Sequence, residues 1–246
     1  ARRERVALEY AYPNPTARMP LLTMRLAHQV IAREVEILQS PTVTVTPHAV
    51  HRTRSGQLEA RVLPTRGHSL VIGLDAWERD LDSRRERWLK STARIIGERP
   101  APRAQFRSLG LYAQDEWATA HERLRVVFGA RFDQGRTHNA TTLNPEYVIS
   151  GGVLQPNPPG QVVLWRERTT RDASWDANAG FHASLTSHLA ASLLVASAFR
   201  SPSLEERFQF IDLGSVVRIG DPALRPERSV STNAGLRWQS AATCRH

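Results

Sequence analysis

Residues 198–208 read AFRSPSLEERF, an apolar run that ends at a proline and continues as a polar segment. Pro202 interrupts a strand because it has no N–H for the ladder. Ser203 and Glu206 have the spacing of a capping box, which predicts a single helical turn. Residues 220–238, GDPALRPERSVSTNAGLRW, then lead into a run of alternating polar and apolar residues. Together the two segments predict a strand that ends in an ordered loop, followed by the next strand.

A period of two residues runs through most of the chain, which is the pattern of strands with one apolar and one polar face. In 123–133, RLRVVFGARFD, and in 172–185, DASWDANAGFHASL, every second residue is apolar. We expect the alternate sets to face outward and inward. The outward set is Leu124, Val126, Phe128, Trp175, Ala177 and Phe181, and the inward set is Arg125, Arg131, Asp176 and Asn178.

The pattern predicts roughly ten long strands, most of them longer than the five or six residues usual in soluble sheets. They lie near 4–12, 21–38, 42–53, 57–64, 69–80, 104–117, 123–135, 173–185, 189–199 and 229–239. A tilted strand of about 9–11 residues is enough to cross a bilayer. These lengths predict an all-β fold, an antiparallel transmembrane β-barrel.

The links between these strands fall into two sets. One set is short, at 39–41, 65–68, 119–122 and 186–188, and it alternates with a second set at 13–20, 54–56, 81–103, 136–172 and 200–228. Membrane barrels have such alternation, with short periplasmic turns and long extracellular loops. A soluble β-sandwich, for example a carbohydrate-binding module, also has alternating strands and is the alternative from another class.

Composition excludes several functions. The 246 residues include 33 Lys and Arg against 24 Asp and Glu, a formal net charge of +9, and one cysteine, Cys244. One cysteine cannot form an intramolecular disulfide or a multi-cysteine metal site. No phosphate loop, HExxH motif or nucleophile elbow is present, so we expect no enzyme. The basic residues lack the interleaved aromatic platforms of single-strand nucleic-acid binders.

The chain resembles TonB-dependent outer-membrane receptors, and two boxes carry most of the resemblance. Phe199, Arg200, Ser201 and Pro202 correspond to the FRAP box of that family, with Ser in place of Ala. Asp221, Pro222, Ala223, Leu224, Pro226 and Glu227 correspond to its NPxLxPE box, with Asp in place of Asn. Residues 107–117 and 123–133 also resemble a barrel hairpin of this family, and the resemblance is best over 104–239.

The resemblance implies an outer-membrane receptor that binds a scarce chelate and imports it with energy from the TonB complex. Barrels of this kind have about 22 strands and an N-terminal plug. We therefore expect residues 1–246 to be one part of such a barrel, an open sheet with bare edges near residues 4 and 239. The plug and the TonB contact would lie in an N-terminal part outside this chain.

Arginines gather in the expected outer loops and are the candidate ligand-binding residues: Arg84, Arg85, Arg87, Arg166, Arg168, Arg200, Arg207 and Arg218. A cationic rim would attract an anionic ferric siderophore, which would be the transported ligand rather than a cofactor. Lipopolysaccharide phosphates are the alternative partner of these arginines. The two boxes either contact the ligand or shape the loop.

Haem, cobalamin and other metal chelates are the rival ligands. Haem-type members of the family carry a histidine between the two boxes, where it can ligate iron. Residues 203–219 contain no histidine, which counts against haem. His138 and His182 remain possible ligands. His48 and His51 are three residues apart, so on a strand they face opposite sides and would not share a metal.

Overall fold

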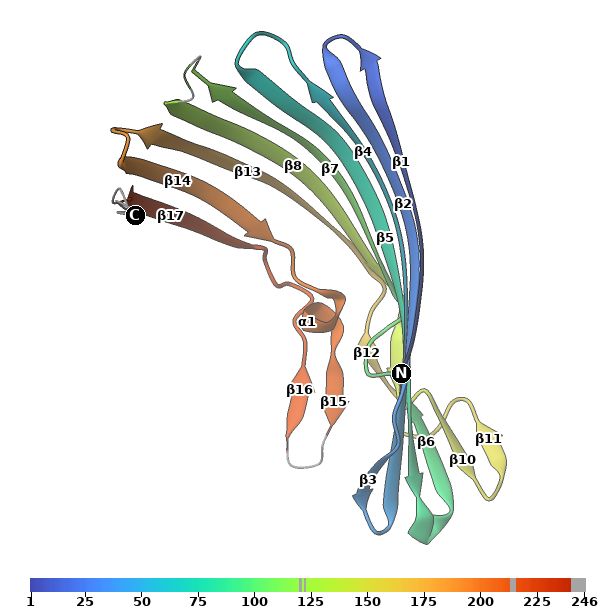
Figure 1. Ribbon diagram of the computed structural model, residues 1–246. Helices are drawn as coiled ribbons and strands as arrows, with labels where there is room; N and C mark the ends of the chain where they lie inside the picture. Colours follow the sequence, from blue (N-terminus) through green and yellow to red (C-terminus); the bar gives the residue numbers. More distant parts are fainter. Residues whose placement is uncertain (120, 122, 213–215, 240–246) are drawn as a thin grey trace, which may run out of the picture.

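Nine long strands pair in sequence order to form one curved antiparallel sheet (Figure 1). They are β1 (Arg2–Thr16), β2 (Met19–Glu34), β4 (Val43–Val62), β5 (His68–Leu89), β7 (Ala104–Ala118), β8 (Leu124–Asn139), β13 (Arg168–Ser184), β14 (Leu189–Arg200) and β17 (Glu227–Trp238). The computed structural model describes residues 1–119, 121, 123–212 and 216–239, so Cys244 lies outside the described residues. Within them the sheet is open and has β1 and β17 as its edges, which confirms the all-β, antiparallel expectation.

One rim of the sheet is elaborated by short elements. β3 (Ile37–Ser40) pairs with β4, β6 (Arg94–Glu98) pairs with β5 and β10 (Tyr147–Ser150), and β11 (Val153–Gln155) pairs with β10. Two further ladders join β9 (Thr142–Asn144) to β12 (Val162–Trp165), and β15 (Phe210–Asp212) to β16 (Val217–Ile219). A 3-10 turn, η1 (Lys90–Thr92), and the helix α1 (Leu204–Phe208) complete this rim. At the opposite rim only short links join the strands (Figure 1).

The expected turn at 54–56 is wrong. Because of this error, the links that precede it lie at the rim opposite to the one that we expected. Arg54, Ser55 and Gly56 pair with β2 on one side and with β5 on the other, so β4 is one strand of 20 residues. The sheet therefore has nine long strands instead of ten. Because that turn does not exist, 39–41 lies at the elaborated rim and 13–20 at the short-link rim, opposite to our expectation. The later links keep their expected rims.

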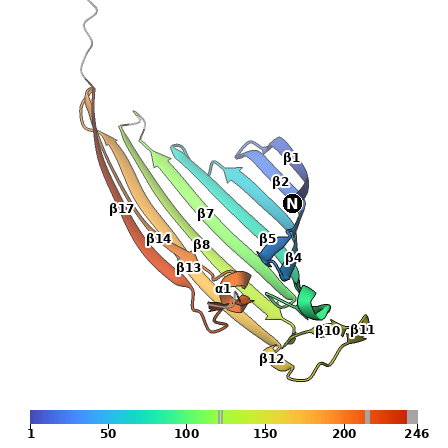
Figure 2. The same cartoon turned by 90° about the horizontal axis from the view of Figure 1, so that it is seen from below.

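The outward and inward sets do lie on opposite faces, as the alternation predicts. Across β8 and β13, Phe128 is opposite Ala179 and Phe132 is opposite Trp175, whereas Arg131 pairs with Asp176 on the other face. The ribbon views show that α1 lies on the concave side of the curved sheet (Figures 1 and 2). Arg207 of α1 contacts Asp172, which is on the same face of β13 as Asp176, so the polar face is the concave one. Large apolar side chains stay exposed on the convex face, among them Val6, Leu8, Leu26, Leu74, Leu111, Phe128, Trp175, Val230 and Leu236. An exposed apolar surface of this extent is typical of a face that meets lipid.

The buried apolar cluster lies between α1 and the wall, near the elaborated rim. Its members are Leu81, Ala101, Ala104, Phe106, Trp165, Leu204 and Phe208. Phe208 of α1 meets Trp165 edge-on, with ring centroids 6.1 Å apart. Over the described residues, no helix is long and apolar enough to cross a membrane.

The two faces can be tested with one matched pair of substitutions in β7. Leu111 lies on the convex face opposite Leu74 and Phe132, whereas Gln114 is three residues along and lines the concave face. In the full-length receptor we expect Leu111→Arg to lower the free energy of unfolding in lipid vesicles by about 2–4 kcal/mol, because an arginine near the bilayer midplane is poorly solvated. Gln114→Arg should cost clearly less. Equal losses in reversible denaturant unfolding would contradict the assignment of the faces.

The edges give a second prediction. The outer sides of β1 and β17 carry rows of backbone N–H and C=O groups that no described strand pairs. Such edges promote aggregation, and closure is what stabilises a barrel in lipid. Expressed alone, the 246-residue chain should form inclusion bodies and should not give a heat-modifiable band after refolding into detergent. A compact, heat-modifiable monomer would contradict this expectation.

Candidate functional site

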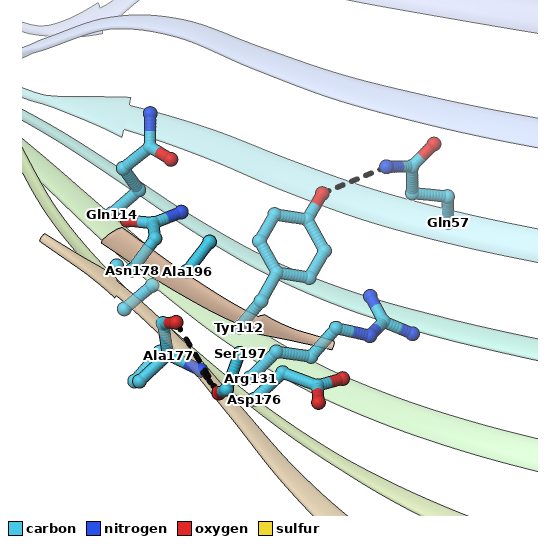
Figure 3. Close-up of a pocket in the computed structure, with 12 residues that line it drawn as sticks. Gln57, Tyr112, Gln114, Arg131, Asp176, Ala177, Asn178, Ala196 and Ser197 are labelled. Atoms are coloured by element: carbon cyan, nitrogen blue, oxygen red, sulfur yellow. Dashed lines mark hydrogen bonds between the residues drawn. The ribbon is translucent and has the colours of Figure 1, made fainter. Parts of the chain in front are cut away.

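The concave face contains two neighbouring hollows that share Arg131 and Asp176. The first has a volume of about 370 Å³ and lies over the middle of the sheet, between Gln57, Tyr112 and Ser197 (Figure 3). The second has a volume of about 430 Å³ and extends toward α1, with Trp77, Phe106, Asp172, Phe199 and Leu204 in its lining. The candidate site is therefore continuous from the wall to the loop that carries the first family box.

Arg131 organises the middle of this site. Its guanidinium donates to Asp75 at 2.7 and 3.1 Å and to Asp133 at 2.6 Å through each of two nitrogens. It also lies over the ring of Tyr112, 5.5 Å from the centroid. Two carboxylates surround one cation, so this part of the concave face offers an anionic ligand no net positive charge.

Tyr112 extends this network to β4. Its hydroxyl donates to Glu59 at 2.7 Å. It also accepts from the side-chain amide of Gln57 at 2.7 Å, and Figure 3 shows this second bond. Gly73 makes room for the ring, because a Cβ at that position would lie 2.1 Å from a ring carbon. None of Gln57, Glu59 and Tyr112 was among the sequence candidates. The sequence does show these polar residues at alternate positions. That pattern predicts which face they occupy, but it does not distinguish a binding site from the rest of the inner face.

Arg200 joins the two family boxes. It donates to Glu227 at 3.0 and 2.7 Å and to Glu206 at 2.9 and 3.0 Å. Glu206 in turn accepts from the backbone N–H of Ser203 at 2.7 Å, and the Ser203 hydroxyl accepts from the N–H of Glu206 at 3.1 Å. This is the predicted capping box. One guanidinium thus links the end of β14, the start of α1 and the start of β17.

A second arginine of the same loop anchors α1 to the wall. Arg207 is almost completely buried, and it donates to Asp172 and to the hydroxyl of Thr170, both at 2.7 Å. Ser201 donates to the same carboxylate of Asp172 at 3.2 Å. The serine that replaces the usual alanine of the first box therefore adds a contact to the wall.

The second box forms a turn ahead of β17. The N–H of Leu224 donates to the carbonyl of Asp221 at 3.1 Å, and the side chain of Asp221 accepts from Ala223 at 2.8 Å. Asp and Asn both supply that side-chain oxygen, so the Asp in this box preserves the turn. The preceding Gly220 lies against α1, where a Cβ would approach the backbone of Arg207 to 2.7 Å.

The arginines of the first predicted cluster lie in a strand instead of a loop. β5 continues to Leu89, because its last residues pair with both β4 and β6. Arg85 is buried and contacts Glu98 at 2.6 Å, and Arg87 contacts the same carboxylate at 2.9 Å. Arg84 is exposed on the same strand.

The remaining candidates occupy several elements of the elaborated rim. Arg166 lies between β12 and β13, Arg168 begins β13, and Arg218 is in β16, and all three are exposed. Among the described residues their guanidinium groups, like that of Arg84, form no hydrogen bond and no ion pair, although Arg84 is near enough to Asp82 to interact with it electrostatically. The eight candidates thus divide into four ion-paired arginines, Arg85, Arg87, Arg200 and Arg207, and four exposed arginines that form no ion pair with a described residue, Arg84, Arg166, Arg168 and Arg218.

The histidines do not assemble a metal centre in the described part of the chain, where no group of three or more His, Cys, Asp or Glu could hold an ion. His138 belongs to β8, not to a loop, and it hydrogen-bonds Thr169. His182 lies in β13, beside a hollow of the concave face. His51 contacts Arg79 at 2.9 Å, and His48 is on the opposite face of β4, as its spacing predicts.

The chain belongs to the family described as TonB dependent receptor-like, beta-barrel, whose sequence profile matches residues 40–243. This family consists of outer-membrane transporters and not of enzymes, as the two boxes led us to expect. The soluble sandwich alternative is therefore wrong. A comparison with curated protein sequences gives no significant match.

Solved structures share the fold at low sequence identity. The copper transporter OprC superposes with a TM-score of 0.72 at 17% identity, over 97% of this chain and 38% of that protein. The ferric yersiniabactin uptake receptor FyuA from Yersinia pestis gives 0.67 at 14% identity, over 97% and 33%. The unliganded ferric citrate transporter FecA gives 0.66 at 10% identity, over 96% and 32%. The chain spans about a third of the length of these structures.

The Arg200 contacts predict a local pH dependence. The Arg200 guanidinium and the Ser203 N–H lower the pKa of Glu206 from 4.5 to about 2. A carboxylate whose pKa is depressed in the folded state contributes to stability above its unfolded pKa and loses that contribution as the pH falls through the folded value. Docking of α1 should therefore be independent of Glu206 titration above about pH 5 and should weaken toward pH 2.

Carboxyl NMR of Glu206 measures this directly. The midpoint should lie near 2 in the unmodified protein and should return toward the ordinary glutamate value in Arg200→Gln. Faster amide exchange over 203–209 should accompany that change at neutral pH. Arg225→Gln removes an exposed arginine of the same loop and serves as the control. An unchanged midpoint in Arg200→Gln would show that Arg200 does not hold the loop.

Proposed function

We propose that residues 1–246 form part of the barrel wall of a TonB-dependent receptor that binds a ferric siderophore at its elaborated rim and imports it. The observation that carries this proposal is the contrast between the two groups of arginines. Arg131 on the concave face is neutralised by two carboxylates, whereas Arg84, Arg166, Arg168 and Arg218 are exposed at the rim. Unpaired guanidinium groups attract and hold anionic chelates.

The neutralised concave face suits the step after capture. A transported ligand must bind strongly enough to enter and weakly enough to leave. Around the hollow between Tyr112, Arg131 and Asp176, carboxylates outnumber the one guanidinium group, so an anionic chelate released from the rim would not be trapped there. Energy from the TonB complex, received through a plug outside this chain, would drive the release.

Similar structures support an iron chelate but do not define it. FyuA, FecA and the import receptor Fiu, which has a TM-score of 0.64 at 12% identity, are described as proteins for ferric yersiniabactin, ferric citrate and ferric catecholates. OprC is described as a copper transporter, so another metal chelate is the alternative ligand. The absence of histidine from 203–219 favours a siderophore over haem.

The proposal is tested by removing the exposed arginines of the rim from the receptor. We expect the variant R84Q/R166Q/R168Q/R218Q to bind an anionic ferric siderophore at least about tenfold more weakly, with the larger loss at low salt, where screening is least. The measurement is fluorescence titration over a panel of ferric siderophores, together with growth on the same iron sources.

A matched control removes four exposed arginines from the opposite rim, in the variant R18Q/R61Q/R66Q/R123Q. This variant should bind the chelate within about twofold of the unmodified receptor, since its substitutions are far from the site of capture. Equal affinity of both variants at both salt concentrations would contradict a role for the rim arginines. Failure of every ferric siderophore to bind would contradict the proposed ligand class.

A further inference from the structure

Three arginines lie side by side on the convex face, where it approaches the elaborated rim. Arg136 of β8 is directly opposite Arg107 of β7 on one side and Arg171 of β13 on the other. Directly opposite residues of an antiparallel pair have Cβ atoms about 4.5–5.5 Å apart, and like charges at that distance repel. An arrangement of this kind is stabilised when an anion lies between the guanidinium groups.

The acidic residues nearby compensate only part of this charge. Glu78 contacts Arg107 at 2.6 Å and is 3.9 Å from Arg54, the next member of the same cross-strand row. Arg136 and Arg171 are exposed and have no acidic partner among the described residues. The row thus contains four arginines against one glutamate, and its uncompensated part is centred on Arg136 and Arg171.

A hollow accompanies the three arginines. Its volume is about 430 Å³, and Arg107, Arg136 and Arg171 line it together with Leu109 and Gln134. The three arginines therefore border one shallow hollow of the convex surface.

The position of the hollow shows what surrounds it. The next residues along the same face of each strand, toward the short-link rim, are Leu109, Gln134 and Ala173, followed by Leu111, Phe132 and Trp175. The arginines are thus the first charged residues beyond the apolar band, where a lipid-facing surface passes from acyl chains to headgroups. Long cationic side chains at such a border can reach the headgroup region.

We propose that Arg107, Arg136 and Arg171 form a binding site for the phosphate groups of an outer-leaflet lipid, the phosphorylated glucosamine headgroup of lipopolysaccharide. Guanidinium groups bind phosphate oxygens in a bidentate manner, and the adjoining apolar band accommodates the acyl chains. The proposal rests on the outer-membrane location of the proposed receptor and is independent of the chelate that it carries. It separates these arginines of the convex face from those of the rim that we assign to the ligand.

The test uses the receptor purified in detergent and three probes: bisphosphorylated lipid A, its dephosphorylated form and inorganic phosphate. Native mass spectrometry measures the bound fraction of each. We expect lipid A to bind, and R136Q/R171Q to weaken its binding at least about tenfold, because two charged donors to phosphate are lost. The control R61Q/R66Q also removes two exposed arginines, at the opposite rim, and should bind lipid A as the unmodified protein does.

Several outcomes would overturn the proposal. Unchanged lipid A binding by R136Q/R171Q would show that these arginines do not contribute to the site. Equal binding of lipid A and its dephosphorylated form would show that the phosphate groups are not recognised. Binding of inorganic phosphate as tight as that of lipid A would mean that the site takes a free anion and not a lipid. An unmodified receptor that binds lipid A but no ferric siderophore would count against the proposed function alone. Heat-modifiable gel mobility establishes that each variant is folded.

Discussion

Backbone pairing within the bilayer is the constraint on which the rest of the structure depends. A strand that crosses lipid must satisfy its N–H and C=O groups with neighbouring strands, and the pairing register then decides which side chains share a face. A shift of one residue would exchange the two faces. It would place Arg131 and Asp176 in lipid and would break the contacts of Arg131 with Asp75 and Asp133. The polar network and the apolar convex surface therefore favour the same register.

The elaborated rim is held by a different balance of forces. Among the described residues, a small apolar cluster, with Leu204 and Phe208 contributed by α1, supports the long link between β14 and β17. Hydrogen bonds and ion pairs add further connections, and the ion pairs join elements that are distant in sequence. Arg200 reaches the start of β17, while Arg207 reaches Asp172 in β13. Pairs of this kind orient a loop precisely even where the net gain in stability is modest, because their geometry is directional.

The sequence was sufficient for the features that depend on local pattern. Alternation identified the two faces of the sheet, and the spacing of Ser203 and Glu206 identified the helical cap. The interruption at 54–56 was misread because Gly56 and its polar neighbours resemble a turn, whereas their pairing with two adjacent strands is non-local. Partners of arginines are non-local for the same reason. Arg131 and Asp75 are 56 residues apart, so neither composition nor spacing distinguishes a neutralised arginine from a free one.

Arginines that the sequence alone does not distinguish therefore have different roles, which depend on their position between the two rims and on the face of the sheet that they occupy. On the concave side Arg131 is surrounded by carboxylates and organises a wall. On the convex side an arginine as deep as Leu111 would be costly, since lipid offers it neither water nor a counter-ion. Arg136 lies on the same convex face, two cross-strand rows closer to the elaborated rim than Leu111. At this border of the apolar band the phosphate groups of lipid headgroups come within reach. The same guanidinium group therefore serves structure or recognition according to which anions its position on the barrel allows it to meet.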